Sequence, residues 1–123
     1  MKKATLAALV VGLVFSAASA GKADDANARS TRMAYDIAMK CFVANGVARG
    51  NNRDLGKTAE AAKYEANARQ SFNAASNLGD KLGYSGTRIN QDFGMAQADQ
   101  LPKLVKDAAY LERTLAMCGS AGL

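Results

Sequence analysis

Two cysteines, Cys41 and Cys118, are the residues whose type and spacing say most about chemistry. A redox-active pair usually has the spacing C-x-x-C, with one thiol acidified by its surroundings, but these two lie far apart in the sequence. We therefore predict a structural disulfide, which is the usual state of paired cysteines in an oxidising compartment. Closing so long a loop would remove roughly 4–5 kcal/mol of entropy from the unfolded state. The alternatives are two reduced buried thiols, a redox role, or pairing between chains.

Histidine, which most often serves as a general base and as a zinc or haem ligand, is absent from the chain. Its absence excludes the C-x-x-C-H haem attachment motif and the Glu-x-x-His motif of di-iron helical bundles. The glycine-containing segment at 46–56 does not contain the phosphate-binding sequence G-x-x-x-x-G-K-[ST]. We therefore expect no catalytic site, no cofactor and no metal site.

Several carboxylates could in principle act as acids or bases, but each has a lysine nearby in the sequence. The carboxylates are Glu60, Glu65, Asp99 and Asp107, and the lysines are Lys57, Lys63, Lys103 and Lys106. Opposite charges close together on a helix usually form local ion pairs, so we predict that these groups are paired rather than catalytic. The four tyrosines are expected to be half-buried, with their hydroxyl groups at the surface.

The first residues have the order of a secretory signal peptide. Two lysines precede an apolar run from Ala4 to Phe15, and the small residues Ala18-Ser19-Ala20 form an A-x-A cleavage site. The run is shorter than the about 20 residues that span a bilayer. We therefore predict that residues 1–20 are a cleaved signal peptide and that the mature chain has no transmembrane segment. Export leads to the periplasm or, as the alternative, to the extracellular medium.

The distribution of charge argues against nucleic acid as a partner. The net charge of the whole chain is +5, and Lys2 and Lys3 of the signal peptide supply part of it. The remaining basic residues alternate with acidic ones along the sequence, whereas a nucleic-acid-binding domain shows a one-sided basic patch. We therefore expect a mixed-charge surface and no nucleic-acid partner.

Apolar residues recur at helical spacing through the rest of the chain. A polar segment at 21–29 is expected to fray, and a first helix should follow at about 30–47. Gly46, Gly50 and the asparagines 51 and 52 are expected to end this helix. A second helix is predicted from Thr58 to Leu82, with Asp54 or Thr58 as its N-terminal cap and Gly83 at its C-terminal end.

The last part of the sequence predicts two more helices with an open boundary between them. Ser85 can cap the third helix, whose apolar stripe includes Ile89 and Phe93. Pro102 lacks the backbone donor that a helix interior needs, so it kinks the helix or begins a new one. Asp107 offers a second possible cap. The break therefore lies at Pro102 or near Asp107.

These elements predict an all-α fold, a small four-helix bundle-like domain over residues 30–123, cross-linked by one disulfide. In a regular up-down bundle, the end of the fourth helix lies near the start of the first. Cys41, however, falls in the middle to late part of the first helix. The last helix must therefore be short or angled to bring Cys118 to its partner.

An exported helical protein without a reactive centre is most simply a binding protein. We expect its partner to be another macromolecule of the envelope, most simply a protein. The role would be that of an inhibitor, an assembly accessory or a holdase-like protein. The alternative is a carrier of a small apolar ligand in the helical core. A cavity for such a ligand would be lined by Phe42, Phe72, Phe93 and Leu111.

Overall fold

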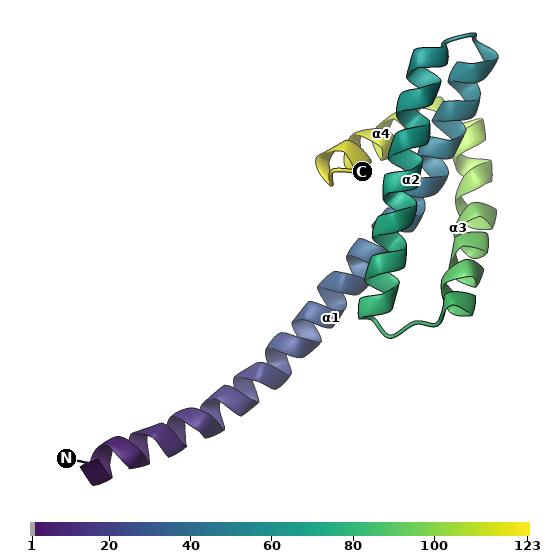
Figure 1. The fold of residues 1–123 in the computed structure, drawn as a ribbon. Helices are drawn as coiled ribbons and strands as arrows, with labels where there is room; N and C mark the ends of the chain where they lie inside the picture. Colours follow the sequence, from purple (N-terminus) through teal and green to yellow (C-terminus); the bar gives the residue numbers. More distant parts are fainter. Residues whose placement is uncertain (1) are drawn as a thin grey trace. The chain divides into compact units, whose positions relative to one another are not determined.

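The computed structural model describes the backbone of residues 2–123 and the side chains of residues 25–123. It has four helices: α1 (Lys2–Asp54), α2 (Thr58–Lys81), α3 (Gly86–Lys106) and α4 (Ala108–Ser120) (Figure 1). The described residues include no strand, and the all-α prediction is confirmed. The chain forms two units, one ending at Ser30 and one from Thr31 to Leu123.

The first unit consists of the N-terminal part of α1. The predicted signal peptide, residues 1–20, lies outside the residues whose side chains are described, so its cleavage stays a prediction. The segment at 21–29 belongs to α1, and the side chains of residues 25–30 are exposed. The helix thus begins well before the predicted start near Ser30, because this segment is rich in alanine and has no proline to interrupt it.

The C-terminal end of α1 also differs from the prediction. Gly46, Gly50 and the asparagines that follow do not end the helix, which continues to Asp54. A glycine inside a helix costs only about 1 kcal/mol, and Ala48 on the same segment is buried against the core. The side chain of Asn52 also stays within the helix, where its Nδ2 donates a hydrogen bond to the carbonyl oxygen of Ala48 at 2.7 Å. Packing therefore outweighs the local preference for a turn.

Glycines with a left-handed backbone allow the turns on either side of α2. Gly56 (φ +72°) precedes α2 and Gly83 (φ +77°) follows it. The predicted position of Gly83 is therefore confirmed. The predicted N-terminal caps are wrong, because the capping position is Lys57, which makes no side-chain capping hydrogen bond. Asp54 instead ends α1, and Thr58 is the first helical residue of α2.

Capping side chains decide where α3 and α4 begin. Ser85 Oγ accepts a hydrogen bond from the backbone N–H of Arg88 at 3.1 Å, as predicted. Of the two possible breaks, the chain takes the one at Asp107, whose backbone is extended. Asp107 Oδ1 accepts a hydrogen bond from the N–H of Tyr110 at 3.1 Å. Pro102 lies inside α3 and does not end it.

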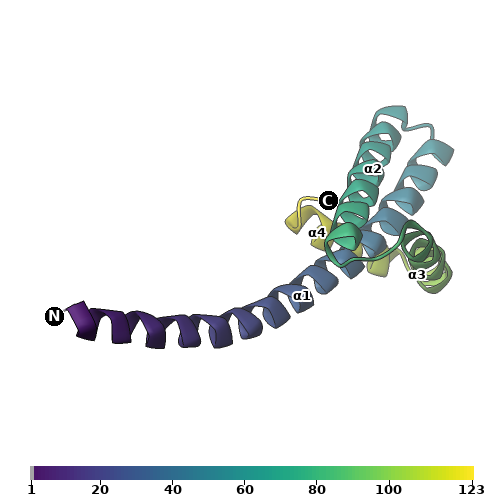
Figure 2. The same ribbon diagram turned by 60° about the horizontal axis from the view of Figure 1, so that its bottom comes forward.

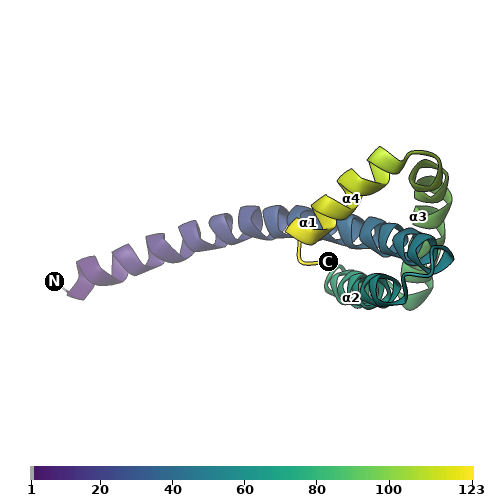
Figure 3. The ribbon, with the colours of Figure 1, turned by 90° about the horizontal axis from the view of Figure 1, so that it is seen from above.

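Within residues 31–123, α1 and α2 lie side by side and run in opposite directions, and α3 packs beside α1 at an angle to both (Figures 1 and 2). The helix α4 has only 13 residues, and it crosses α1 instead of running along it (Figure 3). Its C-terminal end is joined to the middle of this unit's part of α1 by a disulfide between Cys41 and Cys118, with the Cα atoms 5.7 Å apart. The prediction of a short or angled last helix is therefore confirmed.

Two apolar clusters form the core, one on either side of the disulfide. The first cluster joins α1, α2 and α3 through Tyr35, Ala38, Met39, Ala75, Ile89 and Phe93. The second joins α1, α3 and α4 through Val43, Ala44, Leu104 and Leu111. Gly79 of α2 packs against the first cluster, where a Cβ would lie 2.7 Å from the Cδ1 of Ile89. The close approach of α2 to its neighbours thus requires glycine at this position.

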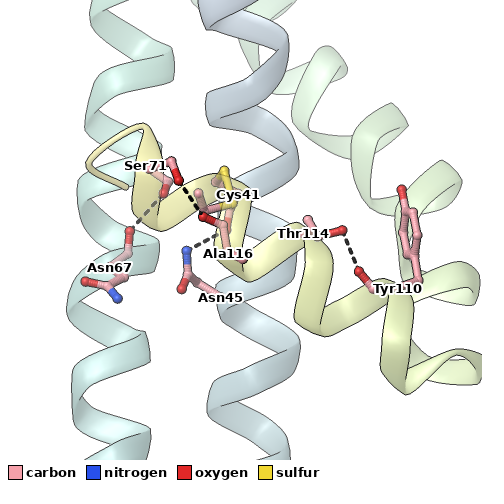
Figure 4. Close-up of a disulfide and its surroundings, with 9 residues drawn as sticks. Cys41, Asn45, Asn67, Ser71, Tyr110, Thr114 and Ala116 are labelled. Atoms are coloured by element: carbon pink, nitrogen blue, oxygen red, sulfur yellow. Dashed lines mark hydrogen bonds between the residues drawn. A yellow bond between two sulfur atoms is a disulfide. The ribbon is translucent and has the colours of Figure 1, made fainter.

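Three buried polar side chains surround the disulfide (Figure 4). Asn45, Ser71 and Thr114 are 1%, 0% and 4% exposed. Each donates a hydrogen bond to the carbonyl oxygen four residues earlier in its own helix, at 2.8–2.9 Å. Their donors are therefore satisfied before the helices meet, and α1, α2 and α4 can pack closely around the two sulfur atoms.

Candidate binding groove

The surroundings of the two cysteines indicate a structural role and not a reactive one. Cys41 and Cys118 are 0% and 1% exposed and form the disulfide between α1 and α4 (Figure 4). A redox-active cysteine is typically accessible and lies in an electropositive environment. The predicted pairing is confirmed, and the burial of the disulfide supports its structural role.

Two of the carboxylates singled out in the sequence, Asp99 and Glu65, lie beside basic side chains. Asp99 lies 3.3 Å from the Nζ of Lys103, as predicted. A hydrogen bond from Gln100, together with this ion pair, lowers the pKa of the Asp99 carboxyl below its ordinary value. Glu65 lies near two arginines, Arg49 and Arg69, at 3.6 and 3.5 Å, and not near the lysine expected from the sequence.

One tyrosine departs from the prediction of a surface hydroxyl. Tyr35 is 3% exposed, and its hydroxyl donates a hydrogen bond to Asp92 Oδ2 at 2.7 Å. Burial, together with this carboxylate, raises the pKa of Tyr35 well above its ordinary value. Asp92 also pairs with Arg88 at 3.5 Å. Nothing in the sequence pattern identifies this contact, because its two residues are on different helices.

Three of the four residues predicted to line a ligand cavity meet between α1, α2 and α3. The ring centroids of Phe42 and Phe93 are 5.0 Å apart, and those of Phe72 and Phe93 are 4.8 Å apart. At these separations the rings contact one another and fill the space between the helices. The fourth residue, Leu111, belongs to the other core cluster with Leu104. The four side chains therefore do not surround one common cavity.

A surface groove of about 430 Å³ lies along the C-terminal part of α1, beside α3, and we call it the α1–α3 groove. Its lining residues are Phe42, Val43, Gly46, Val47, Arg49, Gly50, Asn51, Asp54, Ala68, Gln97, Leu101 and Val105. Leu101 and Val105 are four residues apart on one face of α3 and are 41% and 65% exposed. The groove is therefore mainly apolar and open to solvent.

Two glycines deepen the floor of the α1–α3 groove. Gly46 and Gly50 are four residues apart and so share a face of α1. A Cβ at either position would meet nothing within 4 Å, in contrast to Gly79. Each glycine makes the helix about 1 kcal/mol less stable than alanine would, and no side chain among residues 25–123 occupies the space that it leaves. The backbone of α1 is thus accessible at the floor of the groove.

Arg49 places a positive charge at the groove. It lines both the α1–α3 groove and a neighbouring hollow of about 280 Å³. Its Nη1 lies 3.6 Å from the Oε1 of Glu65, which is too long for a hydrogen bond. Its buried Nε finds no hydrogen-bond partner among the described residues. Arg49 and Arg69 share the single carboxylate of Glu65, so this group of side chains keeps a net positive charge that an anionic partner can offset.

A larger hollow of about 560 Å³ is lined in part by Asp36, Asp92 and Asp99. Asp92 already accepts a hydrogen bond from Tyr35, and Asp99 is paired with Lys103. In the described part of the chain, no group of three or more cysteine, aspartate or glutamate residues could hold a metal ion. The α1–α3 groove is therefore the better candidate site, because its apolar wall at Leu101 and Val105 is exposed to solvent.

Comparisons with protein-family models, with curated proteins and with solved structures find no match. Among the described residues, no helix has the length and apolar character needed to cross a membrane. The α1–α3 groove is thus the feature from which a function can be inferred.

Proposed function

We propose that this chain is an exported, non-catalytic protein that binds a segment of another envelope protein in the α1–α3 groove. The observation that carries the proposal is the exposure of Leu101 and Val105 beside a mainly apolar groove of about 430 Å³. Neighbouring apolar side chains at the surface favour association, because a partner removes them from water. Export rests on the predicted signal peptide, and the buried disulfide is compatible with it.

The dimensions of the groove fit a short segment better than a whole folded surface. Its lining extends from Phe42 to Asp54 on α1 and from Gln97 to Val105 on α3, about 18 and 12 Å at the rise of an α-helix. Stable interfaces between folded proteins bury about 1,200–2,000 Å² in total, which is more than a groove of this length provides. An inhibitor, an assembly accessory or a holdase-like protein would use such a groove to hold an exposed apolar segment.

A carrier of a small apolar ligand is less well supported. The groove has a volume in the usual range for ligand sites, but such sites enclose most of the ligand, and Leu101 and Val105 stand at an open surface. Between the helices, the rings of Phe42, Phe72 and Phe93 contact one another, and the hollow of about 280 Å³ that Phe42 and Phe72 line is also lined by Arg49, Glu65 and Arg69. These contacts favour a partner that lies on the surface.

Site-specific photocrosslinking tests the proposal in cells that express the full chain with its own leader. The crosslinking amino acid is placed at Val105 in the groove or at Met33 outside it, since both native side chains are 65% exposed. We expect the Val105 position to capture a defined envelope protein that the Met33 position does not capture. The substitution Leu101→Glu should abolish this product, because it buries a charge in the apolar contact.

Equal capture of the same protein from both positions would contradict the proposal. Capture from the Val105 position that is unchanged by Leu101→Glu would also contradict the proposal. Far-UV circular dichroism of the Leu101→Glu variant shows whether the helices are intact, and Val105→Glu provides a second disruption of the groove that should have the same effect.

A further inference from the structure

We infer that the occupant of the α1–α3 groove is an amphipathic α-helix of the partner, with an acidic side chain opposite Arg49. This inference rests on the proposed function and names the chemistry of the partner. Three features carry it: the uncovered face of α1, the glycine floor of the groove, and the net positive charge at Arg49.

The short last helix leaves one face of α1 uncovered. The helix α4 is bound to α1 through Cys41, and Gly50 lies nine residues further along, about 180° around the helix axis. The disulfide therefore holds α4 on the face of α1 opposite Gly50, and the views from above and from the side agree that α4 does not run beside α3 (Figures 1 and 3). In a regular four-helix bundle, a fourth long helix would cover such a face. A helix supplied by a partner would restore this packing.

The length and floor of the groove match a helix in particular. Apolar side chains at positions i, i+3, i+4 and i+7 of a helix span about 10.5 Å along its axis. This length fits the wall formed by Gln97 to Val105 of α3. Gly46 and Gly50 have free space above them, so a second helix can approach the backbone of α1 closely. Leu101 and Val105 would then pack against the apolar face of the arriving helix.

Arg49 determines the charge of the partner. Its side chain is 38% exposed, and it shares the carboxylate of Glu65 with Arg69, at 3.6 and 3.5 Å, so a net positive charge remains beside the groove. A carboxylate is the protein group that matches a guanidinium in geometry and charge. Asp54, near the end of the groove, would repel a carboxylate there. The acidic residue of the partner is therefore expected near Arg49 and not at the Asp54 end.

The inference is tested by selecting peptides that bind the full oxidised chain. The peptides come from a displayed library of amphipathic helices in which the residues along one line of the helix surface are randomised. We expect the selected peptides to be enriched in Asp or Glu at one position. Binding should weaken about tenfold with Arg49→Gln, and the same peptides should lose measurable binding to Leu101→Glu. Arg53→Gln is the matched control, because Arg53 is exposed on the same helix and does not line the groove. It should leave the affinity unchanged.

A thermodynamic cycle identifies the pair directly. Replacing the acidic residue of the peptide with its amide should weaken binding to the wild type about tenfold, and it should have no effect on binding to Arg49→Gln. Peptides that depend on Leu101 but show neither acidic enrichment nor sensitivity to Arg49→Gln would overturn this inference and leave the proposed function standing. If no selected peptide depends on Leu101, both fail.

Discussion

Removing the disulfide with the double substitution Cys41→Ala and Cys118→Ala should lower stability by an amount that the structure allows us to estimate. The two cysteines are separated by 77 positions, and closing a loop of this length removes about 4.5 kcal/mol of unfolded-state entropy at 25 °C. A unit the size of residues 31–123 typically has a free energy of unfolding of about 5–14 kcal/mol. The disulfide therefore accounts for at least about a third of the expected stability.

Guanidinium denaturation followed by circular dichroism at 222 nm measures this loss. The cross-linked wild type should unfold at the higher denaturant concentration. The double variant should also show a larger m-value, because an unfolded chain without the cross-link exposes more surface. Wild-type protein that is reduced in denaturant and then refolded is the control for the lost sulfur atoms, and it should resemble the double variant.

A loss below about 1 kcal/mol, in both the double variant and the reduced wild type, would refute the loop-entropy reasoning. A large loss in the variant alone would place the effect in the packing around Cys41 and Cys118 and not in the cross-link.

Three further predictions concern single sites. Thermal denaturation should show Gly46→Ala to be about 1 kcal/mol more stable than the wild type, because the added methyl group has free space. Gly79→Ala should be about 1–2 kcal/mol less stable than the wild type, because its methyl group meets Ile89. Equal effects of the two substitutions would contradict this prediction. Because folding raises the pKa of Tyr35, the protonated hydroxyl stabilises the fold fully below about pH 10, and this stabilisation is lost as the pH rises further. Absorbance at 295 nm should therefore show one tyrosine that ionises only as the protein unfolds. Asp107→Ala should lower stability by about 1 kcal/mol through loss of the cap of α4, and Asp107→Asn should retain most of it; equal losses would argue against capping.

The parts of the fold that depend on local hydrogen bonds could be predicted from the sequence. Ser85 and Asp107 cap helices because each side chain reaches a backbone N–H three residues later. Gly83 ends α2 because its backbone is left-handed. The positions of the two cysteines within their helices were enough to predict that α4 is short or angled, since the disulfide requires Cys118, at the end of the last helix, to reach the middle of the first helix.

Features that depend on packing could not be predicted in this way. Gly46 and Gly50 have the local character of a helix end, but α1 continues through them because Ala48 between them is buried. The contact between Tyr35 and Asp92 joins two helices whose relative rotation is set by the core. No local pattern reports that rotation.

Only part of the candidate groove could be predicted from the sequence. Phe42, Phe72 and Phe93 were identified together, and their rings do meet, but they do not enclose one cavity with Leu111. Leu101 is exposed because α4 packs on another face of α1, an arrangement that no local pattern reports. The net positive charge beside the groove likewise depends on Arg49 and Arg69 sharing Glu65, which lies on a different helix from Arg49.

The most direct test of the central claim is a titration of the ¹⁵N-labelled, oxidised chain with the purified protein captured by photocrosslinking, followed by amide chemical shifts. Glycine amides provide convenient reporters, because Gly46 and Gly50 lie at the floor of the α1–α3 groove while Gly119 and Gly122 lie at the end of the chain. We expect the signals of Gly46 and Gly50 to shift on binding and those of Gly119 and Gly122 to stay unchanged. Shifts at Gly119 and Gly122 with Gly46 and Gly50 unchanged would contradict this expectation.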